Sequence, residues 1–177
     1  LDIHKGEKVL ICGPSGCGKS TLFNCLNGLI PASYSGDATG ELIIKGKSFK
    51  DLDIFSLSKI TGTVLQDSDG QFIGLTVGED IAFAMENDNV QLNEMRERVI
   101  EAAKKVGIDS FLNHAPHELS GGQKQRVSLA GVMVDNVEIF LFDEPLANLD
   151  PASGKKTIEL IDQIYKDTGA TIIIVEH

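Results

Sequence analysis

The chain has 177 residues, a length typical of one domain, and its 26 acidic residues outnumber 16 lysines and arginines to give a formal charge of −10. A chain this acidic is a poor ligand for phosphate backbones and for anionic lipid surfaces, so we expect neither nucleic acid nor lipid as a direct partner. The charge is concentrated in residues 60–95, which contain seven acidic residues and no lysine or arginine.

Other features narrow the class of protein further. No apolar run approaches the roughly 20 residues that a membrane-spanning helix needs, and no basic-then-apolar leader opens the chain. Three cysteines (Cys12, Cys17 and Cys25) lie close together, which favours free thiols in a loop or a small buried site over a disulfide framework. We therefore expect a soluble intracellular protein.

The first third of the chain predicts strands and one helical run. Val9–Cys12 is a continuous apolar run, as expected for a parallel strand buried on both faces. Apolar residues at helical spacing follow over 22–30. Glu41–Lys45 predicts a short antiparallel strand that turns at Gly46, and residues 62–65 form a weaker candidate for a further strand.

Two helices are predicted in the middle of the chain. Thr76 and Glu79 have the spacing of a capping box, which opens the first helix. The second runs from about Leu92 to Val106 and ends at Gly107. We expect the following side chains of these helices to face the core: Ile81, Phe83, Ala84, Met85, Leu92, Met95, Val99, Ala103 and Val106.

The last third predicts two strands with a helix between them. Ile139–Phe142 and Thr171–Val175 are unbroken apolar runs, and Asp150-Pro151 begins a helix that ends at Gly169. Strands alternating with helices indicate an α/β fold with a mostly parallel sheet. A short antiparallel β element and an α-helical subdomain inserted at about residues 72–136 complete the prediction.

Residues 13–21 carry the phosphate-loop pattern G-x-x-x-x-G-K-[ST] between a predicted strand and a predicted helix. In this pattern the glycines aim backbone N–H groups at a pyrophosphate, Lys19 reaches the β- and γ-phosphates, and Ser20 binds Mg²⁺. A glycine-rich turn with an incidental lysine is the alternative, and it would explain neither flanking element. The expected nucleotide contacts are Gly13, Pro14, Ser15, Gly16, Cys17, Gly18, Lys19, Ser20 and Thr21.

Asp143 and Glu144 follow the buried strand Ile139–Phe142 and so stand at the sheet edge beside the phosphate loop. We expect Asp143 to hold Mg²⁺, directly or through water. Glu144, one residue further, could orient or deprotonate a water molecule. A solvated strand end with two acids is the alternative.

Ser120 and Gln123 have the spacing of a second capping box, so a helix begins there. Two glycines in its first turn, Gly121 and Gly122, would destabilise the helix by roughly 1 kcal/mol each. Their presence favours a second anion site over a plain helix cap. Such a helix end could complete the nucleotide site of a second copy of the domain.

These motifs resemble those of the ABC (ATP-binding cassette) ATPases over essentially the whole chain. The matching segments, in the family's order, are Gly13–Thr21, Gln66, Leu119–Arg126, Asp143-Glu144, Asn148-Leu149-Asp150 and His177. The resemblance implies ATP and Mg²⁺ as cofactors, a P-loop NTPase core and an ATPase that dimerises around ATP. It also implies a peripheral position at the cytoplasmic face of the cell membrane, through membrane transporter subunits.

The same resemblance implies roles for individual residues. Gln66 would touch Mg²⁺ and sense the membrane subunit, and Glu144 would be the general base. Ser120 and Gly122 would contact the γ-phosphate of ATP held by the opposite cassette. Asp150 would lie at the dimer interface, and His177 would contact the γ-phosphate.

Two segments narrow the resemblance to the ATPases of energy-coupling-factor importers, which take up vitamins or metal ions such as cobalt and nickel. These segments are Gln66–Phe72 and Leu149–Lys156. The acidic region Gln66–Met95 is then expected to receive a basic segment of the membrane subunits, although a merely solvated acidic face is equally compatible with the charge.

The chain departs from the family at both ends. The family places an adenine-stacking aromatic residue upstream of the phosphate loop, and none of the 12 residues before Gly13 is aromatic. The family also continues past His177, so a fragment lacking the adenine-stacking strand and the C-terminal end is expected.

Three other interpretations agree less well with the sequence. An ABC-type ATPase acting on DNA or the ribosome would need a long coiled coil or a basic linker, and neither occurs between Lys19 and Ser120. A P-loop kinase would have no use for residues 119–123. His114 and His117 are separated by a proline and are expected in a loop rather than at a metal.

Overall fold

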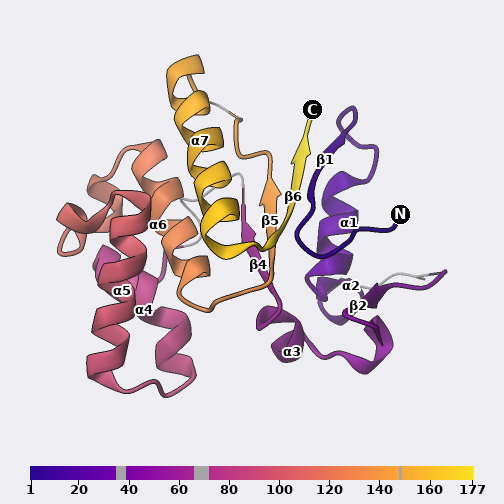
Figure 1. The fold of residues 1–177 in the computed structure, drawn as a ribbon, viewed down its shortest axis with the longest axis horizontal. Coiled ribbons are helices and arrows are strands. Elements are labelled where there is room, and N and C mark those ends of the chain that lie inside the picture. Colours follow the sequence, from indigo (N-terminus) through magenta and orange to yellow (C-terminus); the bar gives the residue numbers. More distant parts are fainter. Residues whose placement is uncertain (35–38, 66–71, 148) are drawn as a thin grey trace.

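The computed structural model describes residues 1–34, 39–65, 72–147 and 149–177. A four-stranded sheet in the order β1-β6-β5-β4 forms its centre, and all neighbouring strands are parallel (Figure 1). A separate antiparallel pair, β2 with β3, occupies the position of the predicted strand and turn. The predicted α/β class is therefore confirmed. The strands are β1 (Lys8–Cys12), β2 (Ile43–Ile44), β3 (Lys47–Ser48), β4 (Thr61–Val64), β5 (Ile139–Asp143) and β6 (Thr171–Glu176).

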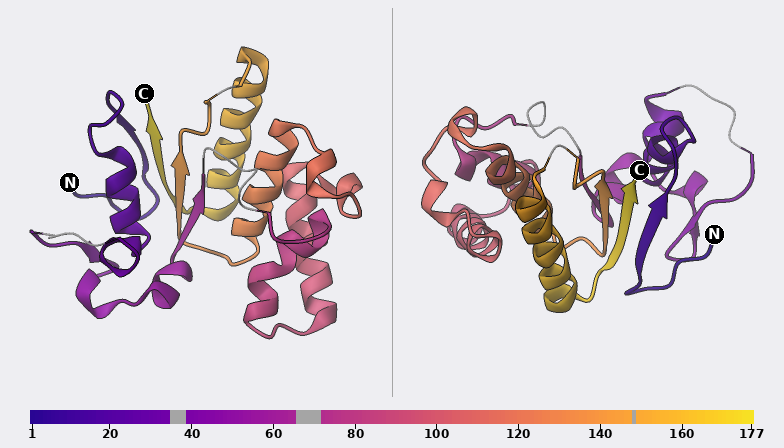
Figure 2. Two further views of the ribbon diagram at one scale, coloured as in Figure 1. Left: turned by 180° about the vertical axis from the view of Figure 1, so that it is seen from behind. Right: turned by 90° about the horizontal axis from the view of Figure 1, so that it is seen from above.

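Helices lie on both sides of this sheet, with α1 on one side and α6 and α7 on the other (Figures 1 and 2). Short 3₁₀ turns occupy residues 49–51, 109–111 and 116–118. None of the described helices is long and apolar enough to cross a membrane. The α-helices are α1 (Lys19–Leu26), α2 (Leu29–Ala32), α3 (Ile54–Ser58), α4 (Val77–Asn87), α5 (Leu92–Val106), α6 (Gly121–Met133) and α7 (Pro151–Thr168).

The central strands separate two apolar clusters because successive side chains of a strand point to opposite faces. Phe140 and Phe142 of β5 face the larger cluster, which contains side chains of α4, α5, α6 and α7. Leu141, between them, packs with Phe23 of α1 in the smaller cluster. The sheet is thus covered on both faces where β5 and β6 run.

The prediction that the first strand is buried on both faces was wrong. Side chains of β1 alternate between exposed and half-buried, and Leu10 is 60% exposed. Among the described strands β1 pairs with β6 alone, so it forms an edge of the sheet. An edge strand has fewer neighbours to cover it, and its apolar composition alone does not reveal that position.

The predicted helical run over residues 22–30 is broken. Helix α1 ends at Leu26, and Gly28 adopts a left-handed conformation with φ of +77°. A Cβ atom at Gly28 would lie 2.7 Å from Cδ1 of Leu57, so the chain turns where α3 approaches it. Ile30, predicted as helical, has extended dihedral angles.

Helices α4, α5 and α6 pack on one another and share the larger cluster with the sheet. The capping box of α4 is confirmed, because Thr76 Oγ1 accepts from the N–H of Glu79 at 3.2 Å. Met85 and Met95 are buried as predicted. Leu92 and Phe83 are exposed, contrary to prediction, because Leu92 is the first residue of α5 and Phe83 lies on the outer face of α4.

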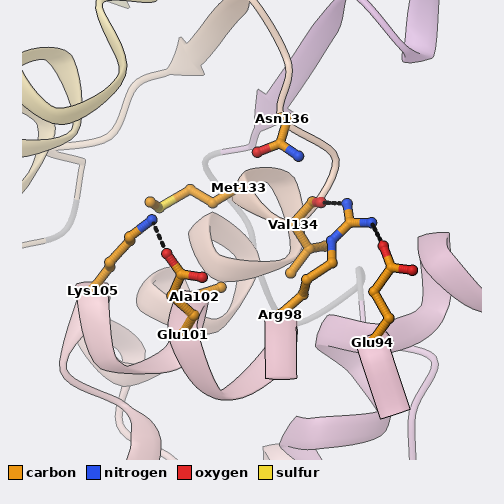
Figure 3. Close-up of a pocket in the computed structure, with 8 residues that line it drawn as sticks. All are labelled: Glu94, Arg98, Glu101, Ala102, Lys105, Met133, Val134 and Asn136. Atoms are coloured by element: carbon orange, nitrogen blue, oxygen red, sulfur yellow. Dashed lines mark hydrogen bonds and ion pairs between the residues drawn. The ribbon is translucent and has the colours of Figure 1, made fainter. Parts of the chain in front are cut away.

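A polar groove of about 240 Å³ lies where α5 meets the C-terminal end of α6 (Figure 3). Arg98 crosses it, bonding both to the carboxylate of Glu94 and to the carbonyl oxygen of Val134. Lys105 pairs with Glu101 at 2.7 Å on the same rim. The groove is about 20 Å along the α6 axis from Ser120, so it forms no part of the predicted anion site.

Candidate functional site

The phosphate loop joins β1 to α1, as the sequence predicts. Gly16 and Gly18 have φ of +79° and +99°, a region that side chains with a Cβ atom avoid. A Cβ atom at Gly13 would lie only 2.7 Å from the sulfur of Cys17. Gly16 and Gly18 are therefore required by the backbone conformation of the loop, which leads directly into the N-terminus of α1.

Lys19 is the first residue of α1 and is buried, although it is charged. Its ammonium group donates to the carbonyl oxygens of Gly13 at 2.7 Å and Pro14 at 3.1 Å. These bonds stretch the side chain back across the loop. Ser20 and Thr21 follow in the first turn and are exposed to solvent. The predicted phosphate-loop residues are thus assembled in one place.

Asp143 ends β5 close to Lys19 and to two further carboxylates. Burial raises the pKa of Asp143, and the negative charges of Glu144 and then Glu176 act in the same direction against the opposing charge of Lys19. This half-buried excess of negative charge would be relieved by a cation. A carboxylate and a serine hydroxyl provide the oxygen ligands that Mg²⁺ prefers.

The donor set at this edge fits Mg²⁺ better than a metal held by protein ligands alone. No group of three His, Cys, Asp or Glu side chains suited to a metal occurs among the described residues. Mg²⁺ is usually held by one or two carboxylates together with substrate phosphates, so Ser20 and Asp143 have the chemistry of its protein ligands, and their role stays a prediction. The third predicted ligand, Gln66, lies outside the described residues.

Glu144 and His177 are in direct contact. Glu144 Oε1 lies 2.8 Å from Nε2 of His177, and the side chains are 12% and 53% exposed. Glu144 has φ of +49°, which is rare for a residue with a side chain, and its N–H donates to Val175 at 2.9 Å. An exposed imidazole therefore holds a nearly buried carboxylate at the sheet edge.

Sequence reasoning named both residues but did not pair them. The signal that could have done so is the register of the parallel strands, in which Asp143 stands opposite Val175. Glu144 is the residue after Asp143, and His177 is the second residue after Val175. Their contact follows from the alignment of two strand ends.

Glu176 was missed entirely. Its carboxylate accepts from the N–H of Leu146 at 3.0 Å, and its carbonyl oxygen accepts from the N–H of Gly13 at 3.4 Å. One residue thus ties the turn after Glu144 to the first glycine of the phosphate loop. An isolated acid at the end of a strand carries no sequence signal for this role.

The predicted helix start at α6 is confirmed. Ser120 donates its N–H to the side chain of Gln123 at 2.8 Å, and the Ser120 hydroxyl accepts from the N–H of Gln123 at 3.4 Å. Apart from the backbone of α6 itself, no atom of the described residues lies within 4 Å of a Cβ placed on Gly121 or Gly122. The anion-binding role of this helix end stays a prediction.

The two candidate phosphate-binding helix ends are far apart within one chain. Helix α1 and helix α6 lie on opposite sides of the central strands in all three views (Figures 1 and 2). The structure therefore does not bring Ser120, Gly121, Gly122 and Gln123 to the chain's own phosphate loop.

Asp150 has a local structural role. Its carboxylate caps α7 by accepting from the N–H groups of Ala152 at 3.0 Å and Ser153 at 3.1 Å. The side-chain hydrogen bond from Ser153, helped by these backbone bonds, lowers the pKa of Asp150. Its predicted place at a dimer interface stays a prediction, and Asn148 lies outside the described residues.

Comparisons with known proteins agree with these motifs. The family model described as ABC transporter matches residues 1–147. The chain is 61% identical over 177 residues to an ABC transporter ATP-binding protein of Photobacterium profundum, and 62% identical to one of Clostridium perfringens. The match covers all of this chain and 31% of each relative, so the chain spans about a third of their length.

Two solved structures have the same fold along the whole chain. CbiO1 of Clostridium perfringens, part of the ABC transporter complex CbiONQ, matches with a TM-score of 0.90 and 35% identity, over 100% of this chain and 69% of that protein. The ATP-binding cassette MJ0796, described as a dimer in a post-hydrolysis state bound to ADP and Pi, matches with a TM-score of 0.83 and 34% identity. That match covers 100% of this chain and 77% of MJ0796.

Proposed function

This chain belongs to the ABC transporter family, whose ATP-binding domains are ATPases, and we propose that it binds and hydrolyses ATP to power a membrane transporter. One observation carries the proposal. The buried ammonium group of Lys19, the carboxylate of Asp143 and the contact between Glu144 and His177 lie together at the edge of the sheet beside the phosphate loop.

The position of each site residue supports one role in ATP hydrolysis. The N–H groups of the phosphate loop bind the β- and γ-phosphates, and Lys19 exchanges its bonds to the Gly13 and Pro14 carbonyls for phosphate oxygens. Mg²⁺, held by Ser20 and Asp143 and predicted to meet Gln66, would supply neutralisation of phosphate charge. Glu144 accepts a proton from the water that attacks the γ-phosphorus in line with the departing ADP.

His177 supports this step through its bond to Glu144. The imidazole holds the carboxylate in one orientation, and its exposed ring remains open to the γ-phosphate. Because the Glu144 carboxylate is already held in one orientation, less conformational entropy is lost when it binds the attacking water. The contact of His177 with phosphate is the role that the family resemblance implies.

Two cassettes are needed for a complete site in this proposal. Because α1 and α6 lie on opposite sides of the strands, Ser120 and Gly122 of one cassette are free to bind the γ-phosphate held by another (Figure 2). Asp150 would lie at the same interface. The dimeric cassette MJ0796, described with ADP and Pi, supports this arrangement.

We place the membrane subunits against the acidic region Gln66–Met95. The segment before α4 exposes Ile73 and Leu75, at 66% and 83% of their surfaces. On the outer face of α4, Phe83 is flanked at helical spacing by Glu79 and Glu86. An apolar centre bordered by acids is suited to an amphipathic helix with a basic face.

The transporter would be an importer of the energy-coupling-factor type, for a vitamin or a metal ion. The segments Gln66–Phe72 and Leu149–Lys156 carry this resemblance, and the likeness to CbiO1 of the CbiONQ complex supports it. Membrane subunits of this kind would hold the ATPase at the cytoplasmic face of the cell membrane.

The decisive test is Glu144→Gln in the full-length protein that contains this chain. ATP binding should persist, because the phosphate loop is untouched. Turnover should fall by about 10²–10⁴, the range that general-base assistance provides. Steady-state release of phosphate and binding of a fluorescent ATP analogue measure the two quantities, with the exposed Glu41→Gln as control. Turnover of Glu144→Gln at the wild-type rate would refute the assignment.

A further inference from the structure

Gln125 connects three elements at the centre of the molecule. It lies in α6, five residues after Ser120, and its side-chain Nε2 donates to the carbonyl oxygen of Pro145 at 2.8 Å. Its Oε1 accepts from the hydroxyl of Thr157 on α7 at 3.3 Å. Gln125 and Thr157 also line one small gap of about 10 Å³, so the side chain is closely surrounded.

The carbonyl that Gln125 contacts belongs to the residue immediately after Glu144. The turn that begins at Glu144 is further held by the bond from Ala147 N–H to the carbonyl of Glu144 at 3.0 Å, and by the bond from Leu146 N–H to Glu176. Glu144 has φ of +49°, a left-handed conformation that is unfavourable for a residue with a side chain. Such a conformation persists only where surrounding bonds enforce it.

We propose that Gln125 is a positioning residue for ATP hydrolysis: through Pro145 it fixes the backbone at Glu144, so that the carboxylate stays against His177. The inference rests on the proposed function. Helix α6 begins at Ser120 and carries Gln125 about one and a half turns later. Helix α6 therefore connects Ser120 to the backbone beside Glu144 of the same chain.

The orientation of the Gln125 amide follows from Thr157. The hydroxyl donates to Oε1, so Nε2 is the group that faces Pro145. A glutamate at this position has the same shape but places an acceptor oxygen against the Pro145 carbonyl. Gln125→Glu therefore removes the bond to Pro145 with little change in volume.

The test compares kcat and KM for ATP in the full-length protein. Gln125→Glu should lower kcat by about tenfold, the loss expected for one hydrogen bond, and should leave KM and the Kd for a fluorescent ATP analogue within about twofold. Thr157→Val should lower kcat in the same direction, because the amide loses its orienting donor. Thr157→Ser keeps the hydroxyl and should restore the wild-type kcat, and the exposed Gln163→Glu is the matched control.

The outcomes separate the inference from the proposed function. Wild-type kcat in both Gln125→Glu and Thr157→Val overturns the inference, and so does a fall in kcat accompanied by an equal loss of ATP affinity. If Gln125→Glu melts below the assay temperature, the comparison of Thr157→Val with Thr157→Ser decides. Wild-type protein that binds no ATP and releases no phosphate refutes the proposed function instead.

Discussion

Replacing Gly62 with alanine should destabilise the protein, because β4 and α6 approach too closely to admit a methyl group. A Cβ atom at Gly62 would lie 2.1 Å from Cγ1 of Val132 and 3.1 Å from Cγ2 of Val137. Valine in a helix is confined to essentially one rotamer, so Val132 cannot swing aside. Overpacking of this kind costs about 1–3 kcal/mol of the free energy of unfolding.

Thermal melts and urea unfolding measure the effect. For a domain of this size each kcal/mol shifts Tm by about 2–4 °C, so Gly62→Ala should lower Tm by about 2–12 °C. Val132→Ala removes the atom that the new methyl group would strike. The double variant should therefore lose less stability than the sum of the two single variants, by at least about 1 kcal/mol.

Gly131→Ala is the matched control, because it is a glycine-to-alanine change in the α6 residue next to Val132. In the described parts of the chain, no atom outside the backbone of α6 lies within 4 Å of a Cβ placed there. Alanine in a helix interior is favoured over glycine by about 1 kcal/mol, so this variant should be more stable than wild type. Wild-type stability of Gly62→Ala, or additivity with Val132→Ala within about 0.5 kcal/mol, would refute the packing argument.

The proposed docking surface and the half-buried acid Asp135 can each be tested by substitution. Leu75→Ser combined with Glu86→Lys should reduce recovery of the membrane subunits in a pull-down of the full-length protein while ATP binding is kept; unchanged recovery, equal to that of the control Glu41→Lys, would exclude this surface. Burial, supported by the charge of Asp88, raises the pKa of Asp135 against the opposing charges of Lys59 and Arg98. As pH rises, the Asp135 carboxyl loses its proton in the unfolded chain before it does so in the folded protein. The free energy of unfolding therefore falls as pH rises from about 3.9 through the folded-state pKa. Asp135→Asn should therefore raise Tm at pH 7, with the difference closing near pH 4, and an equal difference at both pH values would contradict this.

Local spacing in the sequence was enough to find the main chemical groups. The glycines and Lys19 of the phosphate loop, and the capping boxes at Thr76 and Ser120, are set by residues within a few positions of each other. The buried strands β5 and β6 were also recognisable, because a continuous apolar run is typical of a parallel strand covered on both faces. These features are predictable because the residues that interact are only a few positions apart in the sequence.

Long-range contacts were not predictable in the same way. Glu144 meets His177, Glu176 accepts from Leu146, and Gln125 donates to Pro145, over separations of 20 to 33 residues. The exposure of Leu10 also depends on which strand becomes the edge of the sheet. A single sequence contains the residues for these contacts but not the alignment of elements that creates them.

Under the proposed function, the opposite placement of α1 and α6 would set the reaction order of ATP hydrolysis (Figure 1). If one cassette supplies the phosphate loop and another supplies Ser120, the rate for separate cassettes grows with the square of their concentration until they pair. Two cassettes joined in one polypeptide meet at a fixed effective concentration, so the rate is then proportional to the amount of protein. A dilution series of the purified protein therefore reports how the two halves of each catalytic unit are connected.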